Sequence, residues 1–273
     1  MELCVPVTDI FRRNQNSLLP LVGAVSFKEP TDEEFPGKVH MLECSLNIAS
    51  PTFGKELQEA GLADALRSGR FTSFACDIGP AFPSIEIARS ANGFPRYVPN
   101  SPMMTEEEYF LSGEANLKEL RSFYQGQVKL ENLNYFPTGG HEMVCEAGFT
   151  SRLIGHLGVE LLLDIGHVVV TARNLKLDVY EYLEQLPLDT VSEIQVSGSL
   201  VMNGVVEDSH ELPSDEDLNL VSWVVKSFPV RYATLEYYKD DEKLVAGYEH
   251  LTQILVQAAG VKPLDPNDIG VSP

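Results

Sequence analysis

Carboxylate and imidazole side chains follow several short apolar runs of this sequence. Two of the carboxylates, Asp164 and Asp208, have a histidine two or three residues further on. Oxygen and nitrogen donors of this kind suit Mn²⁺, Fe²⁺ or Zn²⁺. Converging carboxylates also repel one another unless they share a proton or a cation. The pattern predicts a metal site formed by Glu131, Asp164, His167, Asp208, His210 and Glu236.

Two of these residues are also candidates for catalysis. We expect His167 to act as a ligand or a proton shuttle, and Glu131 to take part in the chemistry as well as in metal binding. Other chemistries lack their motifs. No Gly-x-Ser-x-Gly elbow, Walker-type loop or Gly-x-Gly-x-x-Gly motif occurs in the sequence, which disfavours a serine hydrolase, a P-loop protein and a dinucleotide fold.

The elements that must position these residues alternate between strand and helix along the chain. Strands are predicted at 39–46, 71–78, 127–132, 159–165, 191–197 and 230–237, and helices at 106–124, 143–157, 177–186, 215–228 and 240–259. The run Val159–Ile165 is apolar on both faces, as expected for a parallel strand covered on both sides. This alternation predicts a (β/α)8 TIM barrel, whose active site lies at the carboxyl ends of its strands. We expect one barrel domain over residues 1–262 and a C-terminal tail at 263–273.

Net charge and cysteine content restrict the partners. Twenty Lys and Arg against forty Asp and Glu give a formal charge of −20, which disfavours binding to nucleic acid and to anionic membranes. The four cysteines form no Cys-x-x-Cys pair, so a disulfide framework is not expected. No secretory signal is visible, and the longest apolar stretch, 159–172, is too short to span a bilayer. We therefore expect a cytoplasmic protein.

Several segments in the second half of the chain resemble the multinuclear non-haem iron-dependent oxidative enzymes, the family of the methanobactin-maturation oxidase. The resemblance rests, in order, on Leu130-Glu131-Asn132, Cys145-Glu146-Ala147-Gly148-Phe149, Leu161-Leu162-Leu163-Asp164-Ile165-Gly166-His167-Val168, Asn174, Leu186-Pro187, Glu193-Ile194-Gln195-Val196-Ser197-Gly198, Asp208-Ser209-His210 and Glu236.

This resemblance implies a xylose-isomerase-like barrel that binds two or three iron ions. It also implies that iron and dioxygen modify a residue, usually cysteine, of a small ribosomally made peptide, which a small partner protein presents. By position, the metal ligands carried over are Glu131, Asp164, Asp208, His210 and Glu236.

Three histidines of the family pattern are missing from this chain. Cys76-Asp77 stands where the family has an early His-Gly, and Gln195 and Ser199 replace two histidines of a later strand; His167 stands at a usual asparagine position. Loss of imidazole ligands weakens iron binding. We therefore expect a divergent family member with one to three irons.

Two alternatives remain open from the sequence. In the first, the chain is a mononuclear sugar isomerase or epimerase, in which Mn²⁺, Zn²⁺ or Mg²⁺ takes the place of iron and two carboxylates transfer protons at carbon. In the second, the barrel has lost its metals and survives as a non-catalytic binding subunit.

Overall fold

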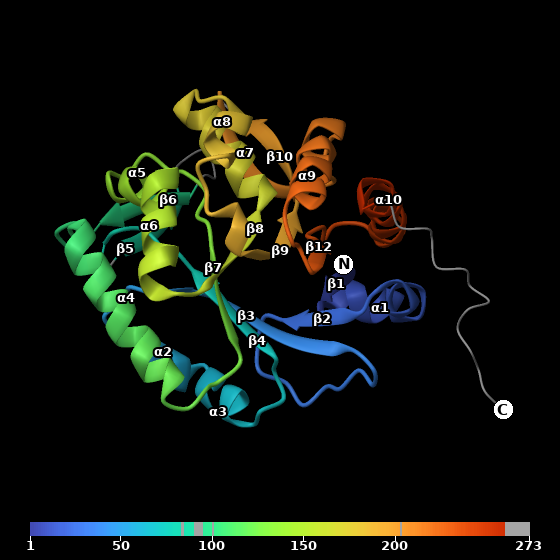
Figure 1. Cartoon of the computed structure of the whole chain (residues 1–273), viewed down its shortest axis with the longest axis horizontal. Helices are drawn as coiled ribbons and strands as arrows, with labels where there is room; N and C mark the ends of the chain where they lie inside the picture. Colours follow the sequence, from blue (N-terminus) through green and yellow to red (C-terminus); the bar gives the residue numbers. More distant parts are fainter. Residues whose placement is uncertain (83–84, 90–94, 100, 203, 260–273) are drawn as a thin grey trace.

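Eight parallel strands close into a barrel in the computed structural model, which describes residues 1–82, 85–89, 95–99, 101–202 and 204–259 (Figure 1). The spatial order is β1-β12-β9-β8-β7-β4-β3-β2. The strands are β1 (Glu2–Pro6), β2 (Ala24–Phe27), β3 (Val39–Asn47), β4 (Ser73–Asp77), β7 (Gln127–Glu131), β8 (Glu160–Asp164), β9 (Val191–Val196) and β12 (Tyr232–Leu235). The predicted TIM barrel is confirmed.

Helices follow seven of the eight strands along the chain and cover the outside of the barrel (Figure 1). They are α1 (Asp9–Leu18), α2 (Phe53–Glu59), α3 (Leu62–Arg67), α4 (Glu106–Arg121), α5 (Gly140–Val144), α6 (Ala147–Leu157), α7 (Ile165–Leu175), α8 (Val179–Leu183), α9 (Asp215–Ser227) and α10 (Asp241–Ala259). The helix predicted at 143–157 is divided into α5 and α6, because the chain is extended at Glu146. The connection between β2 and β3 contains no helix.

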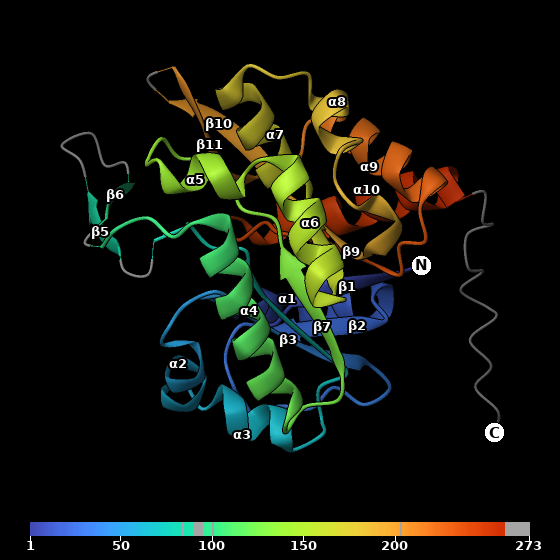
Figure 2. The same cartoon turned by 60° about the vertical axis from the view of Figure 1, so that its left-hand side comes forward.

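Several elements were not predicted from the sequence. Strands β1 and β2 were not predicted, and neither was helix α7, which begins at Ile165, the last residue of the strand predicted at 159–165. Two antiparallel hairpins, β5 (Ile85–Arg89) with β6 (Pro95–Pro99) and β10 (Gly198–Met202) with β11 (Val205–Glu211), follow the carboxyl ends of β4 and β9 (Figure 2). The predicted tail at 263–273 lies outside the described residues.

Side chains alternate between the two faces of each barrel strand, as they do in any β-strand. Outward-facing residues such as Leu161, Leu163 and Ile194 belong to the large apolar core. Inward-facing residues include many buried polar and ionisable groups. They are Ser26, Glu43, Lys129, Asp164, Glu193, Gln195 and Thr234. The apolar core therefore lies between sheet and helices, and much of the barrel interior is polar.

A buried ion pair fills part of this interior. The Lys129 Nζ lies 2.7 Å from the Glu193 Oε2, and the Thr234 hydroxyl donates to the Glu193 Oε1 at 3.0 Å. The Lys129 and Glu193 side chains are only 1% and 3% exposed. Two buried charges of opposite sign compensate each other here without a metal ion.

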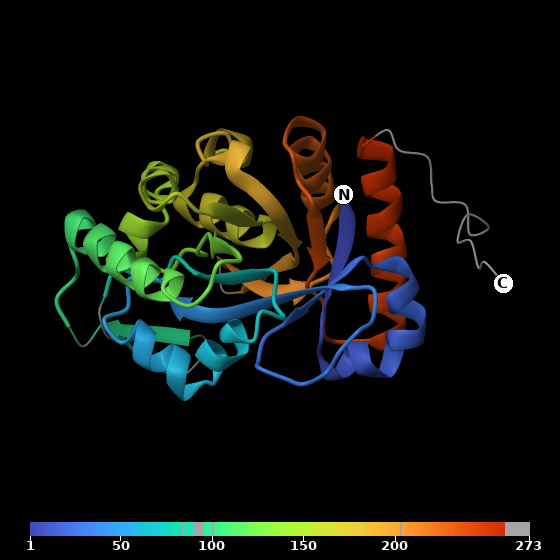
Figure 3. The same cartoon turned by 60° about the horizontal axis from the view of Figure 1, so that its bottom comes forward.

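The first and last described elements of the chain meet where the barrel closes. Strand β1 pairs with β12, and helices α1 and α10, blue and red in Figure 3, lie side by side, joined by an ion pair between Arg13 and Asp241 at 2.8 Å. The Tyr248 hydroxyl of α10 donates to the backbone carbonyls of Cys4 and Leu235. Among the described helices, none has the length and apolar character needed to cross a membrane.

Replacing Lys129 by Met should lower the free energy of unfolding by about 3–5 kcal/mol, because Glu193 would keep a buried charge without a partner. The double variant Lys129→Met/Glu193→Gln should recover most of that loss. Urea denaturation of the three proteins measures the difference. Equal stability of Lys129→Met and wild type would show that this pair does not hold the interior together.

Candidate metal centre

Three of the predicted ligands converge at the carboxyl ends of β7 and β8. Glu131 ends β7, Asp164 ends β8, and His167 lies in the first turn of α7. One donor atom from each lies within 4.8 Å of the others. The His167 Nδ1 is 3.3 Å from the Glu131 Oε1, and the His167 Nε2 is 3.7 Å from the Asp164 Oδ2. Three donor atoms this close to one another can share one ion.

The backbone fixes which nitrogen of His167 is available to an ion. The His167 Nδ1 lies 2.7 Å from the backbone carbonyl oxygen of Asn132. A carbonyl only accepts hydrogen bonds, so Nδ1 carries the proton and donates it. In the neutral imidazole the lone pair is then on Nε2, which faces the carboxylates of Asp164 and Asp208. Metal-binding histidines commonly have this arrangement.

Neighbouring residues hold these three in place. The Asn132 side chain donates to the Asp164 carbonyl at 3.1 Å and accepts from the Asp164 amide at 2.9 Å, which ties the ends of β7 and β8 together. The Asp164 Oδ1 accepts from the His167 amide at 2.8 Å and caps α7. At Gly166 a Cβ atom would lie 2.2 Å from the Ser197 hydroxyl and 3.1 Å from the Asp164 Oδ1, so glycine permits this close approach.

Asp208 and His210 come from a hairpin and not from a barrel strand, which corrects the expectation that every ligand ends a barrel strand. Both lie on β11, and Asn174 of α7 holds this strand through two hydrogen bonds with the backbone of Val206. The Asp208 Oδ2 is 3.6 Å from the Nε2 of both His167 and His210. Asp208 therefore stands between the two histidines. His210 itself has a φ of 47°, in the left-handed region.

Glu236 continues the cluster just beyond β12. Its Oε2 lies 3.4 Å from the His210 Nε2. Its Oε1 accepts a hydrogen bond from the Tyr238 hydroxyl at 2.7 Å and lies 3.0 Å from the Lys28 Nζ. The Lys28 ammonium also contacts Glu43 of β3. The cluster thus extends from β7 to β2 and β3 across the carboxyl-terminal end of the barrel, which we call its mouth.

Crowding of carboxylates shifts their pKa values. Burial, reinforced by the nearby Glu43 carboxylate, raises the pKa of Asp77 to about 7. Burial raises the pKa of Asp164 to about 6, although His167 opposes this shift, and it raises the pKa of Glu131 well above its usual range. For Glu236, burial acts in the same direction, but Lys28 and His210 outweigh it and lower its pKa. Without a bound cation, this region holds more negative charge than it can compensate.

Two buried side chains in the described part of the chain offer unused donor atoms here. The Asp164 Oδ2 and both amide atoms of Gln195 make no hydrogen bond with described residues. Gln195 pairs in register with Asp164 on β8 and with Thr234 on β12. Buried polar atoms are nearly always satisfied. The orphaned Asp164 oxygen, beside an imidazole lone pair and a second carboxylate, fits a divalent metal ion.

The structure brings all six predicted ligands into one network of contacts. Glu131, Asp164 and His167 form one side, Asp208 lies between the histidines, and His210 and Glu236 form the other side. Sequence reasoning missed Lys28, which follows the short apolar run Ala24–Phe27 as the first polar residue after β2. A polar residue ending a strand-like run was the available signal, but the run itself was not identified as a strand.

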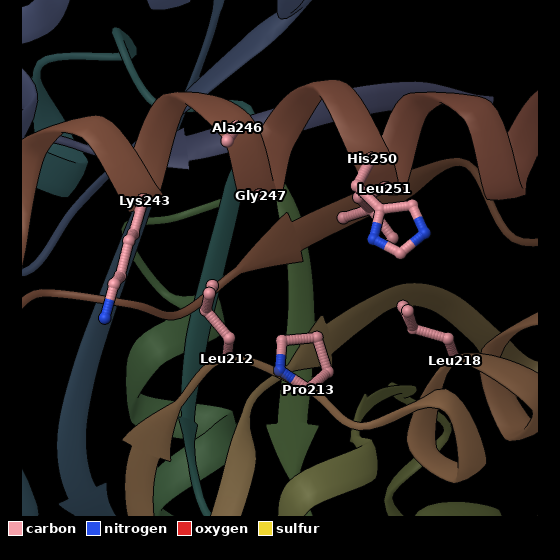
Figure 4. Close-up of a pocket in the computed structure, with 8 residues that line it drawn as sticks. All are labelled: Leu212, Pro213, Leu218, Lys243, Ala246, Gly247, His250 and Leu251. Carbon is pink, nitrogen blue, oxygen red and sulfur yellow. The ribbon is translucent and has the colours of Figure 1, made fainter.

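A separate cavity of about 210 Å³ lies outside the barrel (Figure 4). It is formed by residues after β11 and on α9 and α10, including Leu212, Leu218 and His250. None of the predicted metal ligands lines it. Figure 4 shows mostly apolar side chains around this cavity, which has no convergent acid or base groups comparable to the metal cluster.

A family model described as "RiPP precursor modification enzyme MbnB/TglH/ChrH" matches residues 78–255 of this chain. This segment contains all six predicted ligands. The chain belongs to the MbnB/TglH/ChrH family. The family membership confirms the resemblance that the sequence motifs indicated.

Relatives of this MbnB/TglH/ChrH family member include proteins named UPF0276. One from Vibrio parahaemolyticus is 24% identical over 264 residues, covering 93% of this chain and 91% of the relative. One from Caulobacter vibrioides is 30% identical over 112 residues, 41% of this chain and 40% of the relative.

Solved structures that resemble this family member show the same barrel. A D-psicose 3-epimerase from Clostridium cellulolyticum has a TM-score of 0.61 at 8% identity, covering 95% of this chain and 99% of that chain. Endonuclease IV from Thermus thermophilus has a TM-score of 0.57 at 14% identity, covering 93% and 98%. A putative xylose isomerase from Rhodospirillum rubrum has a TM-score of 0.55 at 14% identity, covering 96% and 100%. At such low identity these likenesses establish the xylose-isomerase-like fold alone.

The metal-free protein should lose stability as the pH rises from about 6.5 to about 8. Folded Asp77 keeps its proton up to a pKa of about 7, whereas unfolded Asp77 ionises near 3.8. The folded state therefore binds more protons than the unfolded state in this window, and the unfolding free energy falls with pH. Neighbouring carboxylates raise the pKa values of His167 and His210, although burial opposes this shift. Both histidines therefore also keep protons in the folded state and lower its stability as the pH rises, as Asp77 does.

The variant Asp77→Asn tests this assignment, because it removes the Asp77 contribution and should flatten the fall. Urea denaturation in the presence of a chelator, at several pH values in this window, gives the comparison. The window starts at about 6.5 because His141, whose pKa burial lowers to about 4, acts with the opposite sign below it. A slope as steep in Asp77→Asn as in wild type would contradict the assignment.

Proposed function

We propose that this chain is a metal-dependent enzyme that uses iron and dioxygen to modify a ribosomally made peptide, as its membership in a family of RiPP precursor modification enzymes suggests. The observation that carries the metal part of this proposal is that one donor atom each of Glu131, Asp164 and His167 lies within 4.8 Å of the others. Cysteine is the residue we expect to be modified, and a small partner protein is expected to present the peptide.

Glu131, Asp164 and His167 would hold one iron ion, and Asp208, His210 and Glu236 supply the donors on the neighbouring side. Iron bound here would supply one-electron chemistry with dioxygen. The Asp208 carboxylate, at 3.6 Å from each histidine Nε2, is placed to serve both sides. His167 then acts as a ligand, since its Nδ1–H is committed to the Asn132 carbonyl. Glu131, whose pKa burial raises, is the ligand that we expect to take part in proton transfer as well.

The β10–β11 hairpin supports binding of a peptide or of the partner at this end of the barrel. Its strands expose large apolar side chains, with Val201 68% exposed. The others on the hairpin are Leu200, Met202 and Val205. Exposed apolar groups gathered on one element favour contact with another chain. Because β11 also carries Asp208 and His210, a chain seated on the hairpin would lie next to the cluster.

One observation favours a second candidate, a mononuclear isomerase or epimerase that uses Mn²⁺, Zn²⁺ or Mg²⁺. Among the described residues, one three-donor group meets the geometry of a single ion, and the Asp208 carboxylate stands beside it as a proton carrier. Turnover without oxygen and a redox-silent metal would support this candidate.

Replacing Asp164 or His210 by Ala should lower the iron content of anaerobically purified protein severalfold, because each removes a donor that no neighbour replaces. Elemental analysis per chain measures the effect. His156→Ala is the matched control, since His156 lies on the outer face of α6 beside Glu114. Unchanged metal content in both site variants would overturn the assignment, as would a wild-type protein that stays metal-free after reconstitution with iron and manganese.

A further inference from the structure

Lys28 joins two buried carboxylates at the side of the mouth opposite Glu131. Its ammonium contacts Glu43 and lies 3.0 Å from the Glu236 Oε1. The Glu43 and Glu236 side chains are 7% and 6% exposed, whereas the Lys28 side chain is 38% exposed. Lys28 therefore reaches inward from the rim and places its charge between carboxylates that solvent hardly touches.

The strand order explains why a lysine from β2 can do this. Strand β2 is the neighbour of β3, which carries Glu43, and β1 alone separates β2 from β12, which Glu236 follows. Strand β1 ends at Pro6, followed by Val7, and offers no charged side chain at this level. The Lys28 ammonium thus passes over the end of β1 and contacts both Glu43 of β3 and Glu236, which follows β12.

Two buried carboxylates held near each other require a cation between them. A metal ion with carboxylate ligands is one solution, and an ammonium group with three donors is another. The fully buried side chain of Gln195 adds a further polar group beside Glu43. Besides the Lys28 ammonium, this group contains the carboxylate oxygens of Glu43 and Glu236 and the amide oxygen of Gln195. Oxygen atoms of this kind bind hard cations.

We propose that the Lys28 ammonium takes the place of a metal ion between Glu43 and Glu236, so that this chain binds metal only among the six predicted ligands and not between these two carboxylates. The proposal deepens the proposed function, on which the metal site itself rests. Lys28 and Glu43 lie before residue 78, outside the segment that matches the family model, so family membership does not account for this pair. Glu236 serves both sides, with Oε1 toward Lys28 and Oε2 toward His210.

The test is to count bound metal in Lys28→Ala. Wild type and variant are loaded anaerobically with Fe²⁺, and separately with Mn²⁺, then freed of loose metal by gel filtration and measured by elemental analysis. We expect Lys28→Ala to hold one more ion per chain than wild type. The additional ion should be absent from Lys28→Ala/Glu43→Gln, which lacks a carboxylate to bind it, and from Lys28→Arg, which keeps the positive charge.

Lys239→Ala is the matched control, because Lys239 also pairs with a carboxylate, Glu211, but at the surface. It should bind the same number of ions as wild type. Circular dichroism establishes that each variant is folded, and Lys28→Gln, which keeps a polar side chain, is the second variant if the alanine variant is unfolded. An unchanged ion count in folded Lys28→Ala or Lys28→Gln would overturn the proposal.

The outcome separates this proposal from the proposed function. A wild-type protein without metal contradicts the proposed function, whatever Lys28→Ala does. The difference between variant and wild type concerns Lys28 alone. A thermal melt gives a second readout that needs no activity: adding Mn²⁺ should raise the melting temperature of Lys28→Ala more than that of wild type, since the variant gains a binding site.

Discussion

Crowding of buried carboxylates at the carboxyl end of the barrel is the constraint on which the rest of this site depends. Six carboxylates of the described chain gather there, whereas Lys28 supplies a permanent positive charge. The six are Glu43, Asp77, Glu131, Asp164, Asp208 and Glu236. Like charges in a buried setting need protons or cations. Raised carboxyl pKa values, raised histidine pKa values and the lysine contact are different responses to this one imbalance.

This excess of negative charge is possible because side chains alternate between the inner and outer faces of the barrel strands. The residues that face outward are apolar and anchor the helices, so the strands remain stable while their inward positions carry polar groups. Lower in the barrel, Lys129 and Glu193 compensate each other within the protein. At the mouth, no described lysine or arginine pairs with Glu131 or Asp164, whose nearest partner is His167. Lower in the barrel, a buried carboxylate has a lysine partner and forms a structural ion pair. At the carboxyl end, the buried carboxylates without such a partner form the candidate metal centre.

The strand-end rule is why much of the site could be predicted from sequence. Glu131 and Asp164 end strands with strong apolar signals, and a barrel directs such ends to one place. Asp208 and His210 were identified from a carboxylate with a histidine two residues further on, a pair that the family motif also contains, although their β11 hairpin was not predicted. Lys28 was missed because β2 is only four residues long and gives little periodic signal. The free nitrogen of His167 depends on the backbone carbonyl of Asn132, 35 residues earlier in the chain, which no local pattern reveals.

The most direct test of this account is a crystal structure of the anaerobically purified, iron-loaded protein, with anomalous scattering measured at the iron edge. The account predicts an iron peak within coordination distance of the His167 Nε2 and of carboxylate oxygens of Glu131 and Asp164. Between Glu43 and Glu236 it predicts no peak, with the Lys28 ammonium in place. Absence of iron beside His167, or an iron ion in the position of the Lys28 ammonium, would contradict it.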